Sequence, residues 1–191
     1  MKIIVRGRSQ SGLTVLIVFA VAIFISFFPT ISIGQSALRF IYLNCHMDVC
    51  SWMAIKEREV IKENSSGKLF GVTTLECSTT HRNGAYPQSY SCKRNEIEES
   101  SFVVFCSTKN PTVGFKNSET NKWTRNQLVV AQQGVFGYLI SSFTRYLYAC
   151  HDIVWRGQNL DFLGARLGYR VPSPDASGGQ DEVDSILDLM Q

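Results

Sequence analysis

Six cysteines are the residues of this chain whose type and spacing carry the most chemistry. All of them follow an apolar N-terminal segment, and an even cysteine count in a small domain predicts disulfides formed in an oxidising compartment. The sequence alone leaves the pairing open. Because short loops close at the lowest entropic cost, we expect the pairs Cys45–Cys50, Cys77–Cys92 and Cys106–Cys150.

Two of these cysteines are each followed by a histidine, as Cys45-His46 and Cys150-His151. The four side chains would make a nominal Cys₂His₂ zinc set. Neighbouring zinc ligands, however, usually stand about two to four residues apart, and adjacent residues on a strand point to opposite faces. We therefore expect disulfides rather than a metal site, and no cofactor.

No sequence motif specifies an enzyme. The chain contains no Gly-x-Ser-x-Gly elbow, no phosphate loop and no Gly-x-Gly-x-x-Gly. A cysteine nucleophile is disfavoured because every thiol has a partner available. The enzymatic alternative is a small secreted hydrolase that uses His81 or His151 with a nearby carboxylate.

A polar segment between Cys77 and Cys92 is the candidate binding surface. A disulfide would staple this long loop, which carries four side chains suited to contact, and loops of this kind often carry function. These four are His81, Arg82, Tyr86 and Tyr90. Trp52, beside Cys50, is expected instead to pack in the core against a disulfide.

The N-terminus has the pattern of an export signal. Lys2, Arg6 and Arg8 precede an apolar run over residues 13–28, and small residues follow Pro29. We expect a signal peptide over residues 1–34, which makes the protein secreted or periplasmic. In the alternative, the apolar stretch 13–33 is an uncleaved membrane anchor, and the positive-inside rule still places the body on the exported side.

The composition of the remainder suits one domain, over residues 35–170. Without the three basic residues of the signal, the 19 Lys and Arg fall to sixteen, against 16 Asp and Glu. No stretch concentrates Lys and Arg with aromatic residues, so we expect no nucleic-acid partner. The membrane is contacted only through the N-terminal segment, if that segment is uncleaved.

The pattern along the body predicts a small disulfide-stabilised α+β domain, in which antiparallel strands pack on one C-terminal helix. Turn residues 64–67 divide a hairpin over 52–77, the apolar run 102–106 predicts a central strand covered on both faces, and 112–115 predicts an edge strand. Apolar residues spaced three and four apart predict the helix at about residues 135–150. Its outward face would hold Ser141, Ser142 and Arg145.

The C-terminal residues 171–191 are acidic and contain no basic residue. Pro, Ser and Gly over 171–180 predict a flexible linker, and 181–191 form a short amphipathic segment. A helix of this length is marginal in isolation, so we expect a flexible tail that is frayed, that folds back on its own domain, or that docks into a partner.

These observations favour an exported, non-catalytic binding or interaction protein of the cell envelope or extracellular space, with an unknown macromolecular partner. The secreted hydrolase is one alternative. The other is a membrane-anchored accessory subunit that docks through its acidic tail.

Overall fold

The computed structural model describes residues 38–81, 89–90, 92–130, 137–156, 159–169 and 178–191. The predicted signal or anchor segment lies outside these residues. Within the described part of the chain, none of the helices has the length and apolarity needed to cross a membrane.

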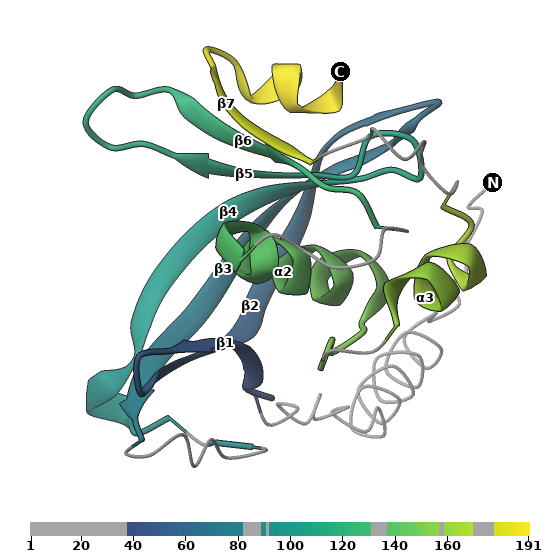
Figure 1. The fold of residues 1–191 in the computed structure, drawn as a ribbon. Helices are drawn as coiled ribbons and strands as arrows, with labels where there is room; N and C mark the ends of the chain where they lie inside the picture. The colour runs from purple at the N-terminus through teal and green to yellow at the C-terminus, as the bar shows by residue number, and fades with distance from the viewer. Residues whose placement is uncertain (1–37, 82–88, 91, 131–136, 157–158, 170–177) are drawn as a thin grey trace, which may run out of the picture. The chain divides into compact units, whose positions relative to one another are not determined.

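Seven antiparallel strands form one sheet in chain order (Figure 1). They are β1 (Ile41–His46), β2 (Val49–Asn64), β3 (Gly67–Thr80), β4 (Glu98–Cys106), β5 (Thr112–Lys116), β6 (Trp123–Gln127) and β7 (Gly179–Val183). The helices are α2 (Ile140–His151) and α3 (Leu160–Arg166), with short 3₁₀ helices η2 (Arg94–Glu96), η3 (Gly137–Leu139) and η4 (Ile186–Met190). The domain is mostly sheet, so the α+β prediction is correct only in part.

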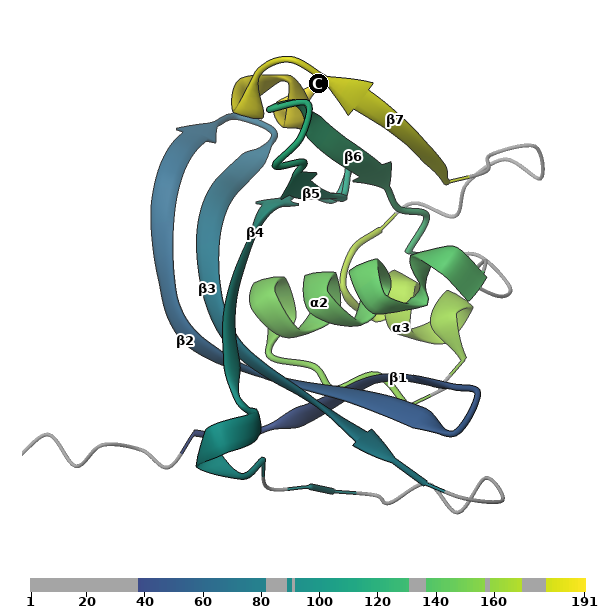
Figure 2. The same ribbon diagram turned by 90° about the vertical axis from the view of Figure 1, so that its left-hand side faces the viewer.

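The predicted hairpin is confirmed as β2 and β3. Its turn is fixed by Asn64, whose Oδ1 accepts hydrogen bonds from the amides of Ser66 at 2.8 Å and Gly67 at 3.0 Å. A side chain at Gly67 would place its Cβ 2.3 Å from the carbonyl oxygen of Cys106, so only glycine fits there. Two bulges in β2 bend the hairpin, and Figure 2 shows the strands curving around α2.

The apolar run in β4 is a central strand with both faces covered, as predicted. Phe102 and Val104 belong to the main core, together with Phe143 and Leu147 of α2. The alternate residues of β4 pack on the other face of the sheet, in a second cluster formed by Leu69, Val103, Phe105 and Leu189.

The predicted helix is α2, which begins at Ile140 after the 3₁₀ turn η3; residues 135 and 136 lie outside the described part. Its predicted outward face is wrong at two positions. Ser142 is buried and its hydroxyl accepts a hydrogen bond from Asn126 at 2.8 Å, and Arg145 contacts Glu76 at 2.9 Å. The reason is the curvature of the sheet, which brings strands against the polar side of the helix as well.

Two predictions about the short strands need correction. Residues 112–115 are not an edge, because β5 lies between β4 and β6. The strand β6 was not predicted at all. Its sequence, WTRNQ, has no apolar alternation, and it is held by pairing with β5 on one side and β7 on the other.

The prediction of a flexible tail is wrong for residues 178–191; the linker residues 171–177 lie outside the described part. Strand β7 pairs with β6, and η4 buries Leu189 completely. Asp181 pairs with Arg125, whose Nε donates to one carboxylate oxygen at 2.8 Å, and this hydrogen bond lowers the pKa of the Asp181 carboxyl. Of the alternatives left open by the sequence, folding back on the domain is the one observed.

The three predicted disulfides are all present, and every cysteine is paired. Cys45–Cys50 closes the β1–β2 turn, Cys77 on β3 bonds Cys92, and Cys106–Cys150 joins the end of β4 to the last turn of α2. Disulfides at this density indicate an oxidising, exported environment.

Candidate binding site

The predicted binding loop is only partly described. Arg82 and Tyr86 lie outside the described residues. Tyr90 is half-buried and stacks on Trp52, with ring centroids 5.7 Å apart. Trp52 itself is fully buried among Cys50, Cys77 and their neighbours, as predicted. A large part of Tyr90 is therefore used in packing rather than in contact with a partner.

His81 belongs to the same cluster through Thr79. The indole Nε1 of Trp52 donates to the hydroxyl of Thr79 at 2.8 Å, and this hydroxyl lies 2.6 Å from Nε2 of His81. The amide of His81 also donates to the carbonyl of Asp48 at 2.6 Å. These bonds hold the end of β3 against the β1–β2 turn.

His151, the other candidate catalytic histidine, begins a chain of hydrogen bonds. Tyr146 donates to the carbonyl of Ser107 at 3.0 Å and accepts from its amide at 3.2 Å, so Tyr169 must donate to Tyr146 across their 2.6 Å contact. Nε2 of His151 lies 2.6 Å from the hydroxyl of Tyr169 and is therefore the donor. This series of hydrogen bonds ends on the backbone carbonyl of Ser107. It contains no carboxylate and no nucleophile of the kind that the hydrolase alternative requires.

Burial shifts the pKa values of the three side chains in this hydrogen-bond network, and each shift favours the neutral form. Desolvation raises the pKa of Tyr146 to about 12, raises the pKa of Tyr169, and lowers the pKa of His151. Both phenols are therefore neutral near pH 7. His151 is neutral there as well, and protonating it opposes folding.

A pH titration tests this assignment of His151. Because its pKa is lower in the folded than in the unfolded protein, its stabilising effect is complete above the unfolded value of about 6.5 and is lost as the pH falls toward the folded value. His151→Gln keeps a donor for Tyr169 but does not titrate. We expect the melting temperature of the wild type to fall more steeply than that of this variant between about pH 7.5 and 5. Parallel curves would contradict the assignment.

The feature that sequence reasoning missed is an open edge on β2. The paired residues of β1 reach β2 only from Val49 to Met53, so residues 56–64 have β3 as their one strand neighbour in the described part of the chain. Every side chain over residues 56–64 is exposed. Figure 2 shows this part of β2 at the outer border of the sheet. The run of alternating charge in KEREVIKE was the available signal.

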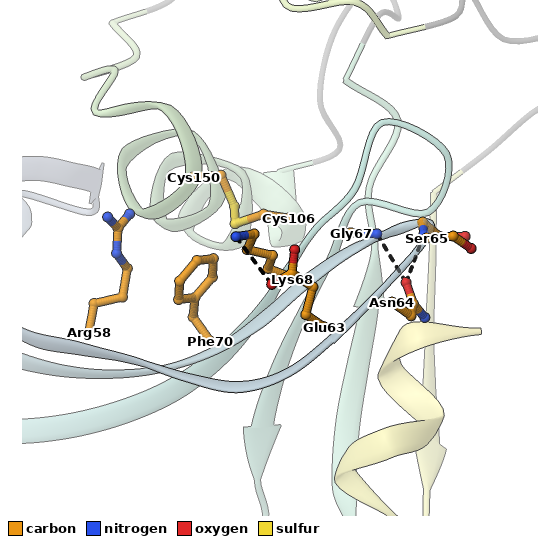
Figure 3. Close-up of a pocket in the computed structure, with 10 residues that line it drawn as sticks. Arg58, Glu63, Asn64, Ser65, Gly67, Lys68, Phe70, Cys106 and Cys150 are labelled. Carbon is orange, nitrogen blue, oxygen red and sulfur yellow. Dashed lines mark hydrogen bonds and ion pairs between the residues drawn. A yellow bond between two sulfur atoms is a disulfide. The ribbon is translucent and has the colours of Figure 1, made fainter.

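A pocket of about 490 Å³ lies beside this edge, on the face of the hairpin toward α2 (Figure 3). Its wall includes Arg58, Phe70 and the Cys106–Cys150 disulfide. The guanidinium of Arg58 stacks over the ring of Phe70, 4.9 Å from its centroid, and donates to the carbonyl of Ala149 in the last turn of α2. These contacts hold a cation in place at the pocket wall.

The opposite rim of the pocket is the hairpin turn. There Lys68 and Glu63 form an ion pair at 3.2 Å, so their charges offset each other, whereas Arg58 has no carboxylate partner among the described residues. The pocket therefore presents one uncompensated positive charge next to an open strand edge. No group of three His, Cys, Asp or Glu side chains in the described part of the chain is arranged to hold a metal ion.

Comparison of the chain with protein-family models, curated proteins and solved structures gives no significant match.

Proposed function

We propose that this protein is an exported, non-catalytic binding protein that holds an extended segment of a macromolecular partner against the open edge of β2. The observation that carries the proposal is the stretch over residues 56–64, which has β3 as its one strand neighbour in the described part of the chain and beside which the pocket lies. An added strand would bond with its main chain to β2, and alternate side chains would point toward the pocket.

The composition of the edge supports a selective rather than an indiscriminate contact. Exposed edges invite aggregation, and proteins limit it with charged side chains, bulges and short strands. β7, at the opposite edge, is short. β2 keeps a long edge, but this edge carries charged residues at most positions. One bulge of β2, between Val60 and Lys62, also shifts its register with β3. Unrelated strands are thereby disfavoured, whereas a complementary strand is not.

Export is the second part of the proposal. The disulfides support an oxidising compartment, and the basic and apolar N-terminus supports delivery there, as a secreted, periplasmic or anchored protein. The acidic tail offers less as a docking element for an accessory subunit, because Leu189 is buried and Asp181 is paired with Arg125.

Site-specific photo-crosslinking in the producing cell tests the proposal. A benzophenone amino acid at Lys62, on the open edge, is expected to form a covalent adduct with a macromolecular partner. The same group at Glu119, an equally exposed position in the β5–β6 turn, is the matched control. Adducts of the same partner at Glu119 alone, or a partner that is retained on the protein without any adduct at Lys62, would contradict binding at this edge.

A further inference from the structure

The charges on the open edge are sorted by face. Within the regular stretch between the two bulges, Arg58 is opposite Val72 and Val60 is opposite Phe70, and both of these β3 residues pack in the core around α2. Glu57 and Glu59 alternate with them and therefore point to the other side of the sheet. The edge presents two carboxylates outward and one guanidinium inward, toward the pocket.

These three charges have no ion-pair partner among the residues that the structure describes. Two other charges on β2 do have partners: Lys56 contacts Glu99 at 2.5 Å, and Glu63 contacts Lys68. Among the described residues, no cation lies within ion-pair distance of Glu57 or Glu59, and Arg58 contacts only the Ala149 carbonyl and the Phe70 ring. Three adjacent charged residues on the open edge of β2 are therefore available to pair with opposite charges on a partner.

A second copy of the chain, paired about Arg58, does not satisfy them. In a two-fold antiparallel pairing that continues the sheet, side chains on the same face meet. If the two-fold axis passes beside Arg58, Arg58 of one copy lies opposite Arg58 of the other copy. Glu57 of each copy then lies opposite Glu59 of the other. Like charges directly opposite each other are destabilising. In this register the edge therefore favours a different chain over a second copy.

We propose, on the basis of the strand-addition function above, that the partner segment contains a basic-acidic-basic triplet. The two basic side chains lie opposite Glu57 and Glu59 on the outer face, and the acidic side chain between them meets Arg58 at the pocket. The triplet reads the same in both chain directions, so it fits a strand added in either orientation. Residues beside the triplet are β-branched or apolar, matching Val60.

Two synthetic peptides with blocked ends provide the test. One is Thr-Val-Lys-Glu-Lys-Val-Thr, and the other has inverted charges, Thr-Val-Glu-Lys-Glu-Val-Thr. Both have the same length and the same flanking residues. At low ionic strength we expect the full oxidised protein to bind the first at least about tenfold more tightly, as measured by calorimetry or by anisotropy of a labelled peptide.

Variants of the edge should move this preference. E57K/R58E/E59K is expected to reverse the preference between the two peptides. If this triple variant is unstable, E57K/E59K, which keeps the Arg58 contact with α2, provides the test and is expected to abolish or reverse the preference. Glu119→Lys, a charge change away from the edge, should leave it unchanged.

The outcomes separate the two proposals. Equal binding of both peptides, with new protection of β2 amides against hydrogen exchange, would overturn the triplet but leave strand addition standing. Binding of neither peptide up to about 1 mM would overturn the triplet together with the site. A preference that survives E57K/E59K would also overturn it.

Discussion

Replacing Cys106 and Cys150 together by serine should lower the free energy of unfolding by about 4 kcal/mol. This disulfide joins residues separated by 44 positions, the longest loop of the three, and so restricts the unfolded chain most. It also fixes the end of β4 to the last turn of α2, at the wall of the pocket. Denaturant unfolding of the double variant, compared with the wild type, measures the loss.

The matched control is the double serine variant of Cys45 and Cys50, whose separation is only 5. The same loop relation gives about 2 kcal/mol for that pair. A variant lacking Cys106–Cys150 that unfolds at the same denaturant concentration as the wild type would show that this bond is not formed, or does not constrain the chain, in solution.

Leu189→Ala should lower the free energy of unfolding by about 2–5 kcal/mol, the usual cost of emptying a buried leucine site. Leu189 is completely buried against Leu69, Val103 and Phe105, on the face of the sheet that α2 leaves uncovered. The terminal atoms of its side chain come close to Gly114, where an added Cβ would lie 2.6 Å from one of them. Thermal or denaturant unfolding measures the effect.

The control lies two residues away. Leu187 is 47% exposed in the same 3₁₀ helix, and its replacement by alanine should change stability by at most about 0.5 kcal/mol. Deletion of residues 179–191 should destabilise the domain at least as much as Leu189→Ala. If the deletion leaves the melting temperature unchanged, the C-terminal segment is a free tail, one of the alternatives that the sequence leaves open, and its docking on the sheet is wrong.

The parts of the fold that the sequence predicted have local causes. The turn at Asn64 and Gly67, the apolar run of β4 and the short disulfide loops depend on residues close together in the chain. Each leaves a recognisable pattern for that reason. The pairing of Cys106 with Cys150 is a partial exception, because these residues are 44 positions apart and the entropy of loop closure favours such a pair only weakly.

The parts that were not predicted depend on distant residues. β6 is a polar pentapeptide whose strand conformation depends on pairing with β5 and β7. β7 also forms an ion pair with β6, between Asp181 and Arg125, which are 56 positions apart. Arg58 meets the carbonyl of Ala149 across 91 positions. Propensity and periodicity contain no information about such contacts.

The candidate site was missed for a related reason. The charged run over residues 56–63 is compatible with a helix surface, with a solvated strand and with an open edge. The difference is made by β1, which ends its pairing at Met53. By contrast, Tyr90, one of the two tyrosines predicted for contact, packs against Trp52, because stacking on a large buried ring removes apolar surface from water.

Amide hydrogen exchange along β2 tests the central claim most directly. In the free, oxidised protein, the amides of residues 56–64 that point away from β3 should exchange rapidly while those bonded to β3 are protected. When the partner segment binds, both sets should be protected. Uniform protection of residues 56–64 in the free protein, or unchanged exchange there in the bound state, would show that the edge is not the binding site.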